Sequence, residues 1–277
     1  MSGWAIMAGI TVREAARKRI LWTALLAGGG FLVLFALALH AQQQDLTARA
    51  VSPFVRYQIL NAMLMVALYV VDLLAVVMSI LTSVDTLAGE ITTGTIHAIA
   101  TKPIARWELL VGKWLGFAAM ITGFVALVFG GTVCISYLMS GIAPQNVLAG
   151  GSLVLLECLL ALTVTLLFGT WFSTITCGVL TIALYGLAFM GGWLEQMSGF
   201  TDSARLASVG IVTSLIMPSE ALWRRAEFDM QGPLAGAMPF SPFSNVSIPT
   251  RVMIGYAVVY LLLALMLAMY RLQRRDL

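Results

Sequence analysis

The sequence predicts an all-α, polytopic membrane protein: a single transmembrane domain over residues 1–277 with six membrane-spanning helices. The first observation is composition, because 60% of the residues are hydrophobic and only 10% are charged, against roughly a quarter in soluble domains. The second is that uncharged runs of about 20 residues, enough to cross a bilayer core of about 30 Å, recur along the chain. This composition excludes a soluble globular protein, a disordered chain and a disulfide-rich secreted domain. The net charge of +3 is too small and too scattered for a nucleic-acid binder.

The six spans are placed on runs that lack charged side chains. Asp72 alone interrupts the second run, and Glu157 alone interrupts the fourth. The fourth and fifth spans form one continuous apolar stretch, which we divide at the polar residues 173–176. The expected spans therefore cover about 20–41, 59–82, 114–139, 147–172, 175–194 and 252–270.

The orientation follows from the lysines and arginines of the loops, which are enriched on the cytoplasmic side. Residues 1–19, 83–113 and 271–277 together hold ten of them, including all three lysines, whereas the alternate loops hold six arginines. Both termini are therefore expected in the cytoplasm, with the chain in the cytoplasmic (inner) membrane. The basic start resembles a signal peptide, but the first apolar run has full span length, so we expect it to be retained.

The long segment between the fifth and sixth spans, residues 195–251, is expected on the outer side. Residues 204–217 are mildly apolar and predict a short interfacial or re-entrant helix. A second helix is expected over 218–228, because serine caps a helix and an acidic residue suits its first turn. Residues 232–249 hold four prolines, typical of a loop or lid. Both a gate and a passive cover of the membrane surface fit this pattern.

The cytoplasmic segment 86–113 contains the sequence GEITTGTIHAIATKPIARWELLVGK. Gly89 and Gly94 are expected to end the second helix as it leaves the bilayer. Pro103 keeps its predecessor out of helical geometry and is tolerated in the first turn of a new helix. The segment is therefore expected to form short helices at the membrane surface, and an ordinary amphipathic connector is the alternative interpretation.

The order and spacing of these residues resemble the ABC-2-type transporter permeases, and the NosY-like permeases most. The resemblance consists of glycine–glutamate, a run ending in Gly–Thr, Lys–Pro, an arginine shortly after, and Gly–Lys at the next span. The amino-terminal VREAARKRILW (12–22) resembles the amphipathic helix that enters span one of that family, and the terminal YRLQRRDL (270–277) resembles its basic ending.

This resemblance implies the permease subunit of an ATP-driven exporter. Two copies, or two related permeases, would pair with two cytoplasmic ATPase subunits that bind ATP and Mg²⁺. Segment 86–113 would then be a coupling segment that docks on the ATPase, with the amino-terminal helix as a second contact. The residues that the resemblance places at this contact are Glu90, Gly94, Thr95, His97, Arg13, Glu14 and Arg17.

No catalytic residue or cofactor is expected in the chain itself. Gly112–Lys113 lacks the upstream glycine of a phosphate-binding loop, so ATP has to be bound by another polypeptide. The three cysteines have no metal-site or redox spacing. His40 and His97 are expected at opposite membrane faces, which argues against an intramembrane enzyme that needs paired ligands.

Asp72 and Glu157 are expected near the bilayer midplane, where an ionised side chain is costly unless it is paired or faces water. One interpretation makes them groups of the transport pathway that recognise a cationic or hydroxyl-rich substrate. The other makes them protonated structural acids, hydrogen-bonded across helices. The hydroxyl groups available for such bonds are Thr163, Thr165, Ser79 and Tyr69.

Two other functions fit the sequence. One is an ion-coupled secondary transporter that uses Asp72 and Glu157. The other is a non-transporting membrane anchor that recruits a cytoplasmic ATPase. No residue selects the transported substrate, and both a homodimer and a heterodimer fit.

Contacts with lipid and between helices are expected near the start of the third span. Arg106 and Lys113 are placed there as anchors at the phospholipid headgroups. Gly112 and Gly116 lie one helical turn apart and allow another helix to approach closely, either at a dimer interface or within the bundle.

Overall fold

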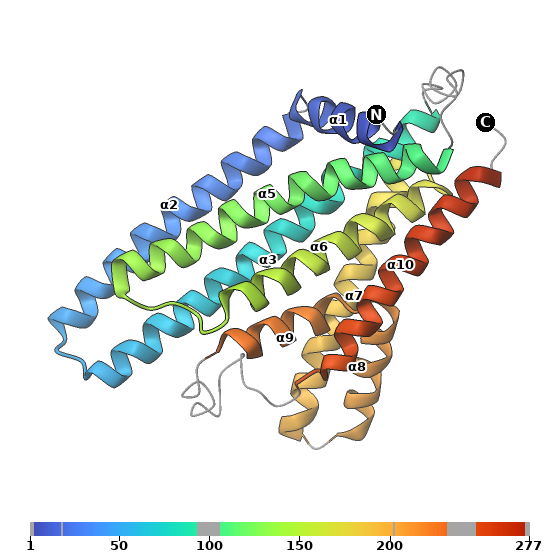
Figure 1. Ribbon diagram of the computed structural model, residues 1–277. Coiled ribbons are helices and arrows are strands. Elements are labelled where there is room, and N and C mark those ends of the chain that lie inside the picture. Colours follow the sequence, from blue (N-terminus) through green and yellow to red (C-terminus); the bar gives the residue numbers. More distant parts are fainter. Residues whose placement is uncertain (1–2, 18, 93–105, 202, 232–247, 275–277) are drawn as a thin grey trace.

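The computed structural model describes residues 3–17, 19–92, 106–201, 203–231 and 248–274, and within these ranges all regular structure is helical (Figure 1). The amino-terminal half contains α1 (Gly3–Arg17), α2 (Arg19–Ala48), α3 (Pro53–Thr92) and α5 (Arg106–Ser140). The remainder contains α6 (Val147–Gly169), α7 (Thr174–Thr201), α8 (Ala204–Ile216), α9 (Ser219–Met230) and α10 (Arg251–Arg274).

Six of these helices are long and apolar enough to cross a membrane, which confirms the predicted fold class. They are α2, α3, α5, α6, α7 and α10. Several continue past the expected ends of the apolar runs. In α2 the polar turn after residue 41 stays helical to Ala48, and there the Gln43 side chain donates a hydrogen bond to the Met139 carbonyl at 2.8 Å.

The continuous apolar stretch of the fourth and fifth spans breaks between α6 and α7. The Thr170 amide and hydroxyl both donate to the Leu167 carbonyl and close the last turn of α6. Ser173 and Thr176 share a hydrogen bond between their hydroxyls at 3.0 Å as α7 begins. Polar residues thus supply hydrogen bonds where the backbone turns back toward the membrane.

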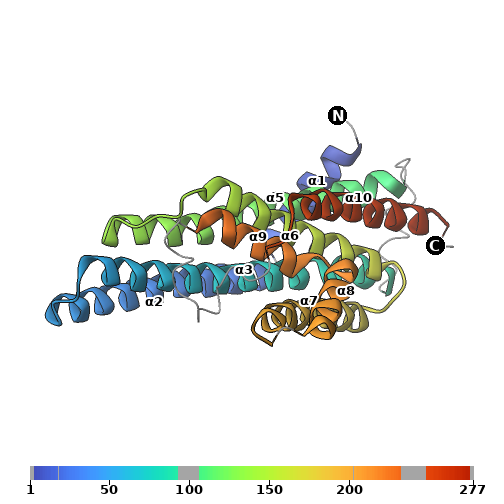
Figure 2. The same ribbon diagram turned by 90° about the horizontal axis from the view of Figure 1, so that it is seen from below.

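The centre of the bundle is α6, which contacts α3, α5, α7, α9 and α10. It is the most buried span, followed by α3, whereas α2 lies at the outside against α3 and α5. Figure 2 shows the helices from below, with α8 and α9 beside the long spans. Because most of α6 is covered by other helices, its interior polar groups depend on those helices for partners.

The segment after α7 forms a bent pair of helices. The chain turns back so that α8 packs along α7, and α9 then leaves α8 at an angle of 103°. Most of α9 is buried, although five of its twelve residues are charged in the sequence SEALWRRAEFDM. The two helices predicted for this region are therefore present, and the second enters the bundle.

Candidate functional site

Asp72 on α3 and Glu157 on α6 meet in the centre of the bundle. Their side chains are 1% and 0% exposed, and each carboxyl lies within interaction distance of the other. Asp72 shares its face of α3 with buried Leu68, Ala75 and Val76, and this face packs against α6. The structure therefore brings together two acids that the sequence placed only at similar depth.

None of the four carboxyl oxygens has a hydrogen-bonding partner among the described residues. The hydroxyls available for structural bonding donate elsewhere. Ser79 donates to the Cys158 carbonyl at 2.7 Å, and Thr165 donates to the Ala161 carbonyl at 2.7 Å. Two ionised carboxylates accept hydrogen bonds but cannot donate one. A proton, a cation or water is therefore needed to neutralise the pair.

A third acid, Glu220 at the start of α9, approaches this pair and interacts electrostatically with both carboxyls. Its side chain packs on the bare backbone of Gly192 in α7, where a Cβ atom would collide with it. Sequence reasoning used Glu220 only as a helix-start residue. Its position in the core depends on the bend before α9, which no local pattern reveals.

Aromatic rings enclose the three acids on the side of α9. The Tyr69 ring lies 5.1 Å from the Trp223 ring and 6.3 Å from the Phe189 ring, between centroids. Trp223 is almost fully buried. Together Asp72, Glu157 and Glu220, which we call the acidic core, lie in an apolar and aromatic surrounding where unneutralised charge is costly.

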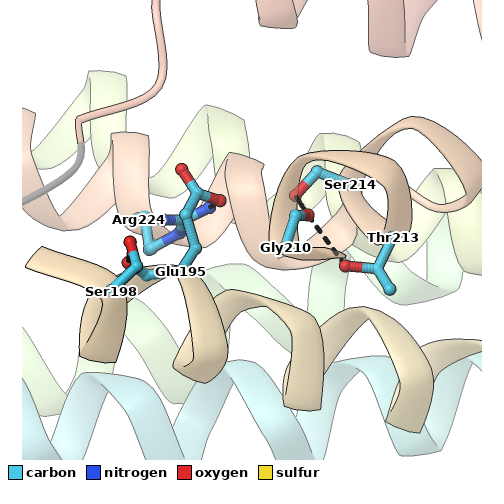
Figure 3. A network of polar contacts seen from close by, with 6 residues as sticks. All are labelled: Glu195, Ser198, Gly210, Thr213, Ser214 and Arg224. Carbon is cyan, nitrogen blue, oxygen red and sulfur yellow. Dashed lines mark hydrogen bonds and ion pairs between the residues drawn. The ribbon is translucent and has the colours of Figure 1, made fainter. Parts of the chain in front are cut away.

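A buried ion pair lies near the acidic core and joins α7 to α9 (Figure 3). Arg224 Nη2 lies 2.7 Å from Glu195 Oε2, and the two side chains are only 4% and 13% exposed. The Ser198 hydroxyl donates to the Glu195 carbonyl at 2.6 Å. An ion pair removed from water in this way is strongly destabilised when one partner is lost.

Next to this ion pair, α8 packs closely against α7. A Cβ atom at Gly210 would lie 2.7 Å from the Gly191 carbonyl oxygen, so the two backbones touch. The Gly210 carbonyl accepts hydrogen bonds from the Thr213 and Ser214 hydroxyls at 2.8 and 3.0 Å (Figure 3). Beside the pair lies a cavity of about 360 Å³. It is lined by Glu195, Ile211, Ser214, Leu215, Ala221, Arg224, Ile248, Pro249, Thr250 and Met253.

The far end of α9 is held by polar contacts with neighbouring segments. Arg225 pairs with Asp229 at 2.8 Å, and Asn146 donates to the Asp229 carbonyl at 3.0 Å. The Gln145 amide donates to the Met230 carbonyl at 3.2 Å. Of the five charged side chains of α9, Arg224 pairs with Glu195 of α7, whereas Arg225 and Asp229 pair with each other within the helix. These ion pairs compensate three of the five charges that α9 brings into the bundle.

The other predicted contact residues lie at one end of the bundle. Arg13 and Glu14 are exposed on α1, which packs on α5 through buried Met7 and Thr11. Glu90 and Arg17 lie on α3 and α1, but their side chains are outside the described part of the chain, as are the residues Gly94, Thr95 and His97. The carboxyl end of α3 lies at the same end of the bundle as α1 (Figure 1).

Lys113 is not a lipid anchor, contrary to the expectation. It is 2% exposed, and its ammonium donates to the Thr86 carbonyl of α3 at 3.5 Å. The expectation was wrong because α5 begins before Lys113 and packs against α3, which covers the side chain. The side chain of Arg106 is outside the described part of the chain.

The predicted close approach at Gly112 and Gly116 is present, and the helix that uses it is α1. A Cβ atom at Gly112 would lie 2.7 Å from the Trp4 carbonyl oxygen, and one at Gly116 would lie 3.0 Å from that of Ala8. The two glycines thus allow α1 to pack closely on α5.

The described residues contain no group of three His, Cys, Asp or Glu side chains arranged to hold a metal ion. Within that part of the chain, Cys134, Cys158 and Cys177 are free thiols.

A comparison with protein families finds that the family model described as ABC-2 family transporter protein matches residues 5–277. The match extends from α1 through all six candidate spans and includes the acidic core. A search of individually characterised proteins found no match.

Proposed function

The chain belongs to the ABC-2 family of transporter membrane proteins, and on that premise we propose that it is the permease subunit of an ATP-driven exporter. The family and the six candidate spans make it a multi-pass membrane protein. The proposal adds a separate ATPase that binds ATP and Mg²⁺, a second permease, and a cytoplasmic-membrane location with both termini inside. The NosY-like subgroup stays a prediction.

The observation that carries this proposal is the acidic core. A purely structural bundle has little reason to retain two adjacent, unpartnered carboxyls among the described residues of its centre. In a transporter, the same groups meet a cationic or hydroxyl-rich substrate when the helices separate. The buried arrangement then corresponds to the closed state, with α9 covering the pathway beside Trp223.

The ATPase is proposed to bind at the end of the bundle that holds α1 and the carboxyl end of α3. The exposed positions of Arg13 and Glu14 support this location, because the opposite face of α1 is already used for packing on α5. Movement of the ATPase would reach α3 through segment 86–113. Because α3 carries Asp72, such a movement bears directly on the acidic core.

Affinity purification in mild detergent from the native membrane tests the partner. We expect a cytoplasmic ATPase in near-equal amount by mass spectrometry. Glu90→Lys should lower its recovery several-fold, since the substitution reverses a charge at the proposed contact. Arg49→Glu, at an exposed site just after the carboxyl end of α2, is the charge-reversal control and should retain the ATPase.

A chain that repeatedly purifies alone, yet is well folded, would contradict the ATP-driven exporter. The acidic core specifically favours one other function in that case, an ion-coupled secondary transporter. Transport by such a carrier should stop when an ionophore collapses the proton or sodium gradient across membrane vesicles. Transport by an ATP-driven exporter should instead stop when ATP is depleted and the gradient is intact.

Variants of the acidic core distinguish a non-transporting anchor from an exporter. An anchor would bind the ATPase equally well with Asp72→Asn or Glu157→Gln and show no change in ATP turnover. An exporter should bind the ATPase normally and change its substrate-stimulated ATP turnover.

A further inference from the structure

A cavity of about 350 Å³ lies where the α6–α7 turn meets the carboxyl end of α10. The described residues that line it are Thr170, Trp171, Arg271 and Arg274. The Arg271 guanidinium lies 5.3 Å from the centre of the Trp171 ring, and that of Arg274 lies 4.5 Å from the centre of the Tyr270 ring. The two cations are therefore held beside the cavity by aromatic rings.

Neither guanidinium forms an ion pair with a carboxylate of the described residues. Two other cavities differ in this respect. In the cavity beside α8 and α9, Arg224 is neutralised by Glu195. The cavity at the far end of α2, of about 430 Å³, has Arg56 as its single arginine. Two arginines without a carboxylate indicate that this cavity suits an anion.

The depth of the cavity points to a lipid. The surface of α10 that precedes it is apolar and exposed at Leu262, Leu263, Met266 and Leu267, as expected for a face in contact with acyl chains. Arg271 follows directly after Tyr270 and lies twenty residues beyond Arg251, or about 30 Å along the helix. This distance matches the hydrocarbon core, so Arg251 and Arg271 lie at opposite headgroup layers.

We propose that this cavity is a binding site for the headgroup of an anionic phospholipid. The guanidinium groups of Arg271 and Arg274 would bind the phosphodiester, because a planar fork of donors matches phosphate oxygens. Trp171 and Tyr270 would lie at the level of the headgroups, where such rings are enriched. The acyl chains would lie along the apolar surface of α10.

The site extends beyond the proposed function and does not depend on an ATPase. It joins α10 to the turn between α6 and α7, so an anionic lipid would stabilise the contact between the last span and the central helix. If the termini face the cytoplasm, this is also the leaflet whose anionic lipids attract basic residues.

The test is native mass spectrometry of the detergent-solubilised full chain, titrated with phosphatidylglycerol or phosphatidylcholine. We expect wild-type protein to retain phosphatidylglycerol preferentially. Each arginine near an anionic surface contributes about fivefold, so Arg271→Gln with Arg274→Gln should weaken that binding roughly tenfold or more. Arg251→Gln is the matched control, since it removes the same charge from the opposite end of the same helix and should leave the binding unchanged.

Two competition experiments distinguish a lipid phosphate from a soluble phosphate. Inorganic phosphate and glycerol phosphate should not displace the bound lipid; if either does so at low concentration, the site takes a soluble anion and the lipid proposal is overturned. Equal loss of lipid in Arg251→Gln would also overturn it, because the effect would then be general. The lipid proposal would also be contradicted if the double variant bound phosphatidylglycerol as wild type does but lost a co-purifying protein, because the two arginines would then bind a protein.

The double variant has to be folded for this comparison. Its thermal unfolding in mixed micelles of detergent and phosphatidylcholine should match wild type, because the substitutions remove no ion pair of the described residues. Added phosphatidylglycerol should raise the unfolding midpoint of wild type and of Arg251→Gln, but not that of the double variant. Equal stabilisation of all three would count against the site.

Discussion

Asp72 and Glu157 place two carboxyl groups side by side where none of the described residues donates to them. Burial of one unpaired charge at the bilayer centre costs about 3 kcal/mol, and a second like charge beside it costs more. Such a pair weakens the closed bundle and becomes favourable when water or a substrate cation arrives. The same two side chains therefore lower the stability of the closed bundle and, in our proposal, bind the substrate during transport.

Asp72→Asn should separate these two effects. The amide supplies a donor to Glu157, so the thermal unfolding midpoint should stay the same or rise. Substrate-stimulated ATP hydrolysis by the complex should fall roughly tenfold or more, since a hydrogen bond to a charged group contributes about 1.5–3 kcal/mol. Asp45→Asn, exposed near the end of α2, is the control. Full activity with lowered thermal stability would support the structural interpretation instead.

The Arg224–Glu195 pair predicts a different pattern, because here the charges compensate each other. Arg224→Met should lower the free energy of unfolding by about 3 kcal/mol, since it leaves Glu195 buried without its cation. The double variant with Glu195→Gln should recover part of that loss, as no net charge remains buried. Chemical denaturation of the single and double variants measures the coupling, and additive effects would contradict it.

At the scale of elements, the spans could be predicted from sequence because uncharged runs are a local signal. The depth of α9 could not be predicted. Its five charged residues are typical of a helix at the surface, and Arg224 is compensated only through its contact with Glu195 of α7. For the same reason the meeting of Asp72 with Glu157 was not predicted, since it requires the packing of α3 on α6.

The α1–α5 contact predicts how the amino-terminal helix reaches the ATPase. Gly116→Leu should displace α1, because even a Cβ atom there approaches the Ala8 carbonyl and the Thr11 side chain. Faster proteolysis of α1 and lower ATPase recovery are expected, with membrane insertion intact. Gly123→Leu is the matched control on the same helix, since nothing lies within 4 Å of its Cβ position. Equal behaviour of the two variants would contradict the contact.

For the molecule as a whole, one continuous helix joins the proposed ATPase-binding end to the buried acidic core. Helix α3 runs from Pro53 to Thr92 and carries both Asp72 and Glu90. A rigid helix transmits a shift at one end over its whole length, so the proposed docking near Glu90 would be mechanically linked to Asp72. Helix α3 therefore connects one residue of the predicted ATPase contact with one residue of the acidic core.

The most direct test of this account is the accessibility of the acidic core during ATP turnover, probed at Ala75, one helical turn from Asp72 on the same face of α3. In a variant whose Cys134, Cys158 and Cys177 are replaced, Ala75→Cys would be treated with a membrane-impermeant maleimide in native vesicles. Negligible labelling is expected without ATP, as Ala75 is 0% exposed, and labelling should rise several-fold when the ATPase turns over. Labelling that is the same with ATP, without ATP and with a blocked ATPase would contradict ATP-driven opening around the acidic core.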